Sequence, residues 1–284
     1  MKQSVQLFIA GSIALLAASC NNQQTTTTEK TTDSSISVTA APKPMPITLT
    51  DVPASPEFPG AQLTMTAPTA AKQGTDSAKI SFAFNVKNYE LKMQTPDAGG
   101  KLCNNSDKGQ HIHFILDNMP YVALYEPKHE VTLANNTEHY VTCFLSRSYH
   151  ESIKEQGAGF VAHFRIDEKG NLQMMKTDTN PMLFYSRPKG DYLGKDTANI
   201  LLDFYLVHAT LGNDYKVKAD IKNETTGATA SFTLNEWKPK FIQGLGTGKC
   251  MVTLTLLGKD GQPVAGPNTT MSRNFQLAAQ EPMK

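Results

Sequence analysis

Apolar and polar residues alternate along most of the chain after residue 60. Every second residue is apolar in residues 80–86, 160–166 and 252–256. Successive side chains of an extended chain point to opposite faces, so this pattern predicts strands with one buried face. Turn-forming sequences such as PDAGG, LANNT and DEKGN separate these stretches. Because the sequence pattern lacks long segments of helical period, we expect an all-β protein.

The spacing of the strands favours a specific architecture, the immunoglobulin-like β-sandwich, which has about seven strands. We expect the first seven strands near residues 61–67, 79–88, 110–117, 121–125, 130–134, 139–145 and 160–166. In this fold the third, sixth and seventh strands share a sheet, and the sixth lies in the middle.

The second half of the folded region repeats the pattern of the first, which indicates an internal duplication. Three pairs of stretches correspond in order and spacing: those beginning at Ile80 and Ile200, at His113 and Ser231, and at His139 and Cys250. We therefore expect two tandem immunoglobulin-like domains, a first sandwich over residues 58–178 and a second over residues 183–279.

Histidines lie on the outward face of the first predicted domain. Because Ile112 and Phe114 must enter the core, His111 and His113 point away from it. The same face carries Tyr140, Thr142 and Phe144 on the sixth strand, and His163 and Arg165 on the seventh. The duplication predicts Thr229 and Ser231 as counterparts of His111 and His113, and Asn274 and Gln276 as counterparts of His163 and Arg165. Folding alone therefore does not require histidine at these positions. The outward Phe144 indicates that a loop or the second domain covers this face.

A His-x-His pair on a strand with a third histidine is a known way to hold zinc or copper. We therefore consider His111, His113 and His163 as metal ligands. The alternative is that these histidines only cover the sheet, which is the commoner role of surface histidines.

A second hypothesis concerns anion binding by cationic and hydroxyl side chains. Arginine forms forked hydrogen bonds to carboxylates and phosphates, and tyrosine adds a hydroxyl donor. The candidates are Tyr140, Arg147, Tyr149, His150, Arg165, Arg187 and Lys189. The alternative is that these residues form an ordinary polar surface.

The first 20 residues have the features of an export signal. Lys2 precedes an apolar run from Val5 to Ala18, and Ala17-Ala18-Ser19-Cys20 resembles the lipobox of bacterial lipoproteins. Cleavage at such a site leaves Cys20 as the lipid-bearing first residue; secretion without a lipid is the alternative. Residues 21–57 are rich in threonine and poor in large apolar residues, so we expect a disordered tether. The sequence thus predicts an exported protein, anchored to the cell envelope by its lipid.

Charge and motifs exclude several functions. The formal net charge is +1, and scattered charges without a basic patch argue against nucleic-acid binding. The chain lacks the common nucleophile, metalloprotease and nucleotide-binding motifs, so we expect a binding protein and not an enzyme. A hydrolase with a concealed site is the less favoured alternative.

The cysteines after Cys20 leave one alternative open. Cys103 and Cys143 could form a disulfide in an oxidising compartment, although sequence alone does not give their geometry. The favoured interpretation is that Cys143 and Cys250 are buried as small apolar residues.

In several sequence segments the chain resembles a family of bacterial envelope proteins that are common among Bacteroidota lipoproteins. Members of this family are often labelled "phosphopeptide-binding protein". The segments are GQHIHFILDNMPYVALYEP, CFLSRSYHES, LFYSRPKGDY and LLDFYLV, and the resemblance extends from about Pro56 to Leu277. It implies an exported two-part β protein without an established reaction, and no site residues are carried over from it. Together the expectations describe an envelope protein that binds a metal or a small anionic ligand, a peptide or another envelope protein through the first domain. The alternative is an adhesion or scaffold protein with incidental histidines.

Overall fold

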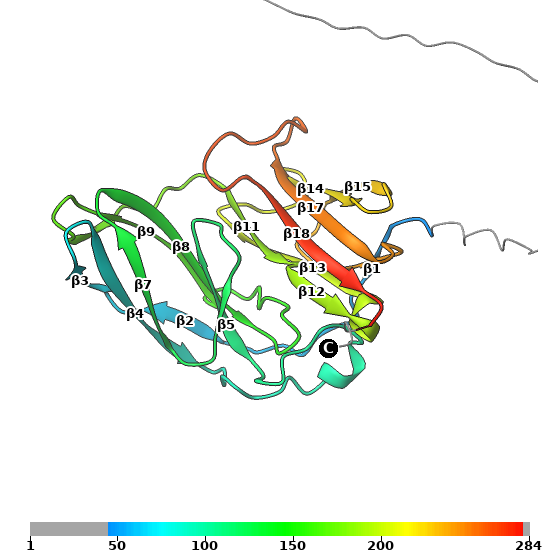
Figure 1. The fold of residues 1–284 in the computed structure, drawn as a ribbon, viewed down its shortest axis with the longest axis horizontal. Helices are drawn as coiled ribbons and strands as arrows, with labels where there is room; N and C mark the ends of the chain where they lie inside the picture. The colour runs from blue at the N-terminus through cyan, green and yellow to red at the C-terminus, as the bar shows by residue number, and fades with distance from the viewer. Residues whose placement is uncertain (1–44, 281–284) are drawn as a thin grey trace, which may run out of the picture. The chain divides into compact units, whose positions relative to one another are not determined.

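The computed structural model describes residues 45–280, which lie in one compact unit (Figure 1). The predicted signal peptide, Cys20 and most of the predicted tether lie outside the described residues. The structure is nearly all-β, with two short 3-10 helices, η1 (Ala98–Gly100) and η2 (Gly194–Thr197). Among residues 45–280 no helix is long and apolar enough to cross a membrane. The predicted all-β class is confirmed.

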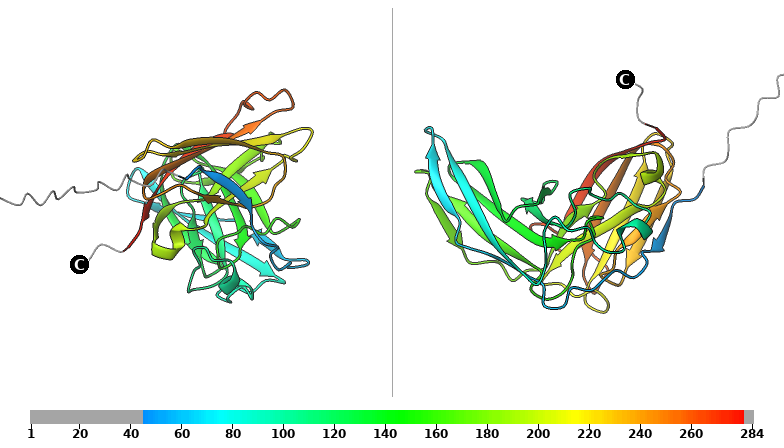
Figure 2. Two further views of the ribbon diagram at one scale, coloured as in Figure 1. Left: turned by 90° about the vertical axis from the view of Figure 1, so that its right-hand side faces the viewer. Right: turned by 90° about the horizontal axis from the view of Figure 1, so that it is seen from below.

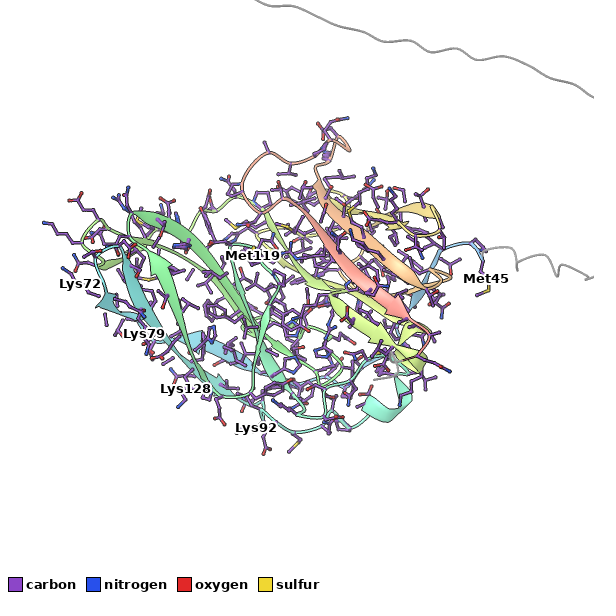
Figure 3. All side chains as sticks on the ribbon, in the orientation of Figure 1. Met45, Lys72, Lys79, Lys92, Met119 and Lys128 are labelled. Carbon is purple, nitrogen blue, oxygen red and sulfur yellow. The ribbon has the colours of Figure 1, made fainter. Side chains whose placement is uncertain are left out.

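The first sandwich consists of two antiparallel sheets. One sheet has β4 (Ser77–Lys87) at its centre, with β2 (Gln62–Met65) and β3 (Thr69–Gln73) along one edge and β7 (Lys128–Ala134) along the other. The other sheet has the order β10-β9-β8-β5-β6, with bounds Leu172–Met175, Gly159–Ile166, Thr137–Ser146, His111–Leu116 and Val122–Leu124. Alternate apolar side chains of both sheets form one core that includes Ile80, Phe82, Phe114, Cys143 and Phe164. Lys72, Lys79 and Lys128 are exposed on β3, β4 and β7 (Figure 3).

The second sandwich repeats this arrangement. One sheet has the order β1-β16-β13-β11, with bounds Thr48–Asp51, Lys240–Gln243, Ile200–Val207 and Met182–Arg187. The other has the order β12-β18-β17-β14-β15, with bounds Gly190–Leu193, Thr270–Ala278, Gly248–Leu257, Lys216–Asn223 and Thr229–Leu234. Only the β12–β18 pair among the described pairings of these sheets is parallel. A second core forms around Phe204, Val252 and Leu254.

The predicted strands of the first sandwich are confirmed, as is the sheet that places the sixth strand, β8, between β5 and β9. This order of strands is that of an immunoglobulin-like sandwich. The sequence pattern did not reveal β3 (TAAKQ) or β10 (LQMM), because both are largely exposed edge strands without a clear alternation.

The predicted tether ends earlier than expected, which corrects its assignment to residues 21–57. Thr48–Asp51 form β1, which pairs antiparallel with β16 of the second sandwich (Figure 2). Ile47 is buried in the second core, and Leu49 packs against it. The short alternation of apolar and polar residues in this segment therefore supplies enough buried surface to order a strand.

The duplication is present, but one of its three predicted correspondences is wrong. The stretch from Ser231 lies on β15, at the edge of its sheet, whereas β5 pairs with the central strand β8. The equivalent of β5 is β14, which pairs with β17. When residues 139–145 of β8 are aligned with residues 250–256 of β17, the strand registers make Lys216 the equivalent of His111 and Lys218 the equivalent of His113. Both β14 and β15 alternate, so sequence similarity alone chose the wrong one. The match of His163 with Asn274 is consistent with the registers.

A third apolar cluster joins the two sandwiches and covers the outward face of β5 and β8. The ring of Phe144 stacks on Tyr205, with centroids 4.5 Å apart. Gly159 permits this contact, because a Cβ there would lie 2.6 Å from the Tyr205 hydroxyl and 2.7 Å from the Phe144 Cβ. Asn118 is buried and bonds the backbone of β11 twice: its amide donates to the Leu183 carbonyl, and its side-chain oxygen accepts from the Tyr185 N–H. The expectation that Phe144 is covered is therefore confirmed.

Candidate metal and anion site

Two of the predicted site histidines lie side by side on β5, beneath the second sandwich. His111 and His113 point away from the core of the first sandwich, as their parity requires, yet both are fully buried. The Tyr121 ring stacks on His113 with centroids 3.5 Å apart, and the Tyr125 ring packs against His111. The strand supplies the spacing of the pair, and the neighbouring elements remove it from water.

A third histidine reaches the pair from the loop after β8. His150 occupies a turn in which its N–H donates to the Arg147 carbonyl. Its φ of +70° is in the left-handed region, which costs a side-chain-bearing residue about 1 kcal/mol. Such strain persists where the surrounding structure fixes it, and it is found disproportionately at functional sites.

The ring nitrogens of the three histidines converge on one region. The distance from His111 Nε2 to His113 Nε2 is 3.0 Å, and the distance from His111 Nε2 to His150 Nδ1 is 3.1 Å. Nitrogen ligands of a tetrahedral zinc ion are about 3.3 Å apart, given metal–nitrogen bonds of 2.0–2.1 Å. One ligand atom from each histidine lies within 4.8 Å of the other two. The cluster therefore has the spacing of a three-nitrogen metal site.

Hydrogen bonding alone does not account for both contacts of His111 Nε2. The Gly109 carbonyl, 2.8 Å from His111 Nδ1, can only accept, so His111 carries its proton on Nδ1 and presents a lone pair at Nε2. That single lone pair faces both His113 Nε2 and His150 Nδ1. It can accept one good hydrogen bond, so one of the two contacts is left without a proper donor. A metal ion would accept all three lone pairs at once.

For two of the three rings, the nitrogen on the opposite side has a partner of the kind that orients metal-binding histidines. His111 Nδ1 donates to the backbone, and His113 Nδ1 lies 3.1 Å from the hydroxyl of Ser186 on β11. Such contacts fix the tautomer and orientation of a ligating imidazole. The Tyr121 hydroxyl lies 3.1 Å from His150 Nδ1, so an oxygen atom that can serve as a metal ligand lies beside the three nitrogens.

Burial and nearby cations keep these imidazoles neutral. Burial lowers the pKa of His111 to about 4, and Arg187 and Lys189 lower it further against the effect of the Gly109 carbonyl. Burial also lowers the pKa of His113 and that of His150 well below the usual value. Neutral imidazole is the form that binds metal, so the site needs no deprotonation of these rings at neutral pH.

The remaining candidate residues of the outer face lie apart from the cluster. His163 pairs across the sheet with Tyr140 and stacks on its ring, and its Nε2 lies 2.7 Å from a Glu138 carboxylate oxygen. Arg165 is exposed farther along β9. His113 instead lies opposite Phe144, four residues along β8 from Tyr140, or about 13 Å. The structure therefore replaces His163 with His150 as the third histidine beside the pair.

Arg147 and Tyr149 flank His150 but turn toward other partners. Arg147 is buried and paired with Glu151 at 3.0 Å, and the Tyr149 hydroxyl donates to Asp97. Both side chains serve to hold the loop that carries His150. Of the predicted anion-binding residues, the structure gathers His150, Arg187 and Lys189 around Tyr121.

Sequence reasoning missed Tyr121 and Ser186. Tyr121 follows the turn between β5 and β6, and Ser186 immediately precedes Arg187 on β11. Both lie in sequence segments that supplied other candidate site residues, but nothing in the local sequence pattern indicates that their side chains contact His113 and His150.

The three described cysteines are free and buried, so the Cys103–Cys143 disulfide considered from the sequence does not form in this structure. Burial raises the pKa of the Cys103 thiol to about 12 and that of Cys250 to about 11. The favoured interpretation of Cys143 and Cys250 as small buried residues is confirmed.

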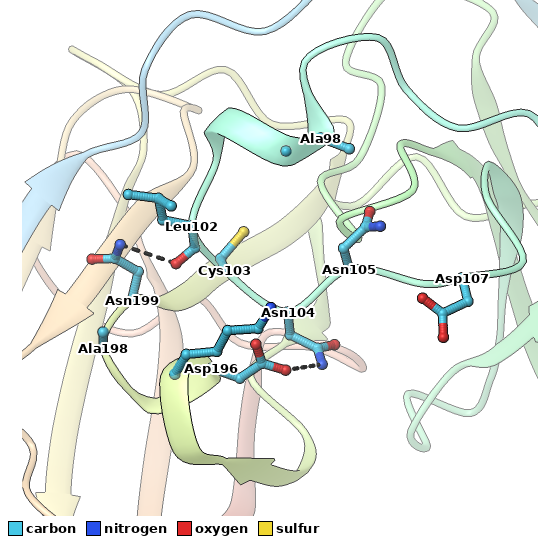
Figure 4. A pocket seen from close by; sticks show the side chains of 11 residues that line it. Ala98, Leu102, Cys103, Asn104, Asn105, Asp107, Asp196, Ala198 and Asn199 are labelled. Atoms are coloured by element: carbon cyan, nitrogen blue, oxygen red, sulfur yellow. Dashed lines mark hydrogen bonds between the residues drawn. The ribbon is translucent and has the colours of Figure 1, made fainter.

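A pocket of about 750 Å³ opens near this region, between the segments 98–107 and 195–199 (Figure 4). Its wall contains both apolar and polar residues: Asn104 donates to Asp196 at 2.9 Å, and Asn199 donates to the Leu102 carbonyl. Arg187 lies behind this wall, with its Nη2 3.5 Å from the Asn104 side-chain oxygen. One residue of the pocket wall, Asn104, therefore contacts Arg187, which in turn packs against the Tyr121 ring.

Comparisons with known proteins give only remote similarities. No family model and no curated protein matches the chain. Among solved structures, fibronectin(III)-like modules of Clostridium thermocellum CbhA match at 10% identity, covering 78% of this chain and 98% of theirs, with a TM-score of 0.27. The extracellular domain of a putative hybrid two-component system from B. thetaiotaomicron matches at 11% identity, with a TM-score of 0.28; the match covers 81% of this chain and 40% of that chain. The chicken interferon gamma receptor alpha chain matches at 8% identity, with a TM-score of 0.23; the match covers 76% of this chain and 97% of the receptor chain.

Proposed function

We propose that this protein binds one transition-metal ion, zinc or copper, at His111, His113 and His150. The observation that carries the proposal is the convergence of three neutral imidazole nitrogens whose contacts cannot all be hydrogen bonds. Imidazole nitrogens suit both zinc and copper. Tyr121 supplies the neighbouring oxygen donor. The protein acts as a binding protein in this proposal, and no catalytic step is assigned to it.

The proposed place of action is the cell envelope. The N-terminal signal and the lipobox-like sequence ending at Cys20 support export and lipid anchoring. Multiple acyl chains on one cysteine hold a protein at a membrane, since each buried methylene contributes about 0.8 kcal/mol. Replacement of Cys20 by Ser is expected to release the protein from the membrane fraction. Retention of the variant there would contradict the proposed anchor.

The metal proposal is tested by elemental analysis of the purified full chain after incubation with zinc or copper and removal of the excess. We expect one metal ion per chain in the wild type, and loss of that ion in His150→Ala. His163→Ala is the matched control, since its histidine is also largely buried but lies outside the cluster, and it should keep the ion.

Thermal unfolding provides a second readout. Free metal at 100 times its dissociation constant stabilises a folded protein by about 2.7 kcal/mol. Wild-type protein should therefore melt at a higher temperature with metal than with a chelator, and His150→Ala should show no difference. Metal-free wild type with an unresponsive melting temperature would overturn the proposal and favour an adhesion or scaffold role.

A further inference from the structure

Arg187 is a buried cation without an anionic partner. The residue is 6% exposed, and its hydrogen bonds go to neutral oxygens: the Tyr192 hydroxyl at 3.1 Å, and Asn104 and the Lys189 carbonyl at 3.5 Å. Its Nε has no hydrogen-bond partner in the described part of the chain. Among residues 45–280, neither Arg187 nor Lys189 has a carboxylate oxygen within 4.0 Å.

The other buried cations of the described chain have carboxylate partners. Lys101 lies 3.1 Å from Asp97, and Arg147 lies 3.0 Å from Glu151. This contrast matters because a buried charge without a partner is strongly unfavourable, and proteins ordinarily pair such charges. The fold does not need Arg187 for an ion pair, so its charge calls for another explanation.

Lys189 adds a second cation at the same place. Its ammonium lies 3.9 Å from the centre of the Tyr121 ring and donates to the Tyr121 carbonyl at 2.9 Å. The Arg187 guanidinium lies 5.4 Å from the same ring. Two like charges therefore converge on one tyrosine, beside histidines that are themselves neutral and supply no negative charge.

We infer that Arg187 and Lys189 bind a small oxyanion, a carboxylate or phosphate group, next to Tyr121 and the histidine cluster. An oxyanion would neutralise both cations and accept a hydrogen bond from the unpartnered Arg187 Nε. Arginine forms charge-assisted hydrogen bonds of this kind well. The pocket in Figure 4 offers an approach, because Asn104 is in its wall and contacts Arg187. This site goes beyond the proposed metal site and does not depend on it.

The inference makes an unusual prediction for the anion-free protein. If Arg187 served only the fold, its removal would be destabilising. If it is held for a ligand, replacing it with an apolar residue of similar length removes an unpaired buried charge. Arg187→Met should therefore melt at the same temperature as the wild type or higher in buffer free of oxyanions.

Binding is tested on the metal-free full chain in the presence of a chelator, by calorimetric titration with inorganic phosphate in one arm and acetate in the other. Chloride at matched ionic strength controls for screening. We expect saturable binding of at least one oxyanion by the wild type. Loss of one charge-assisted contact should weaken it about 10- to 100-fold in Arg187→Met and in the partly exposed Lys189→Met.

Arg273→Met is the matched control, because Arg273 also lies over a tyrosine ring, that of Tyr185, but away from the cluster. It should bind the oxyanion as the wild type does. Absence of saturable binding in both arms, or unchanged affinity in Lys189→Met and Arg187→Met, would overturn the inference. Neither outcome bears on metal binding, which is measured separately on the metal-loaded chain.

Discussion

Acidification should destabilise the metal-free protein in a pH range set by the buried histidines. In the unfolded chain a histidine takes up a proton near pH 6.5, whereas in the folded protein the pKa of His111 is about 4. Between these values the unfolded state binds more protons than the folded state, so falling pH favours unfolding. The part of the free energy of unfolding that depends on neutral His111 is fully present above pH 6.5 and is lost as the pH falls toward 4.

The size of this effect follows from the shift. Each pKa unit corresponds to 1.36 kcal/mol, so the change from 6.5 to about 4 gives about 3 kcal/mol for His111 alone. The lowered pKa values of His113 and His150 act in the same direction. Because single domains are typically stable by only 5–15 kcal/mol, the loss should be plainly measurable.

The assay is urea unfolding in the presence of a chelator, at pH values from 7.5 to 4.5, with the free energy of unfolding extrapolated to water. Carboxylates and other histidines also titrate, so the informative quantity is the difference between the wild type and His111→Gln. The variant should show a smaller loss of stability over this range. His208→Asn is the control for the loss of a histidine outside the cluster, because His208 is exposed and asparagine accepts its φ of +54°.

Two results would refute the reasoning. One is a free energy of unfolding that stays constant, or rises, as the metal-free wild type is acidified from pH 6.5 to 4.5. The other is an equal loss in His111→Gln, which would assign the acid sensitivity to groups outside the cluster.

Three further predictions concern the contacts around the cluster, each measured by the free energy of unfolding. Asn118→Ala removes two buried hydrogen bonds to β11 and should cost about 2–4 kcal/mol; a loss below 1 kcal/mol would mean that water replaces them. Phe144→Ala removes the ring that stacks on Tyr205 and should cost about 3–5 kcal/mol, and a near-neutral result would show that the sandwiches separate readily. Lys154→Met leaves the buried Asp203 carboxylate without its cation and should cost about 3–5 kcal/mol at pH 7; equal stability would contradict this pairing.

Much of the fold was predictable because it depends on local alternation. The strands of the first sandwich follow from which residues must be apolar, and the outward direction of His111, His113 and Phe144 follows from parity alone. The edge strands β3 and β10 were missed because exposed edges place little constraint on sequence. The repeat was mismatched at β15, since two neighbouring strands share the same alternation and only pairing distinguishes them.

The composition of the site was only partly predictable. The sequence supplied His111 and His113, and it also named His150, Arg187 and Lys189, but as members of a separate anion site. It offered His163 as the third metal ligand, on the assumption that all outward histidines of one sheet can meet. The registers show that this histidine belongs to a different part of that face.

The sequence by itself determined the alternating strands of the first sandwich, their buried faces and the position of two histidines on one side of β5, because each of these depends on residues within a few positions of one another. Tertiary structure decided which partners the pair acquires. His150 is 39 residues from His111, and Ser186 is 73 residues from His113. Their meeting depends on the path of a loop and on the docking of one sandwich against another, which are set by long-range packing and leave no periodic signal in the chain.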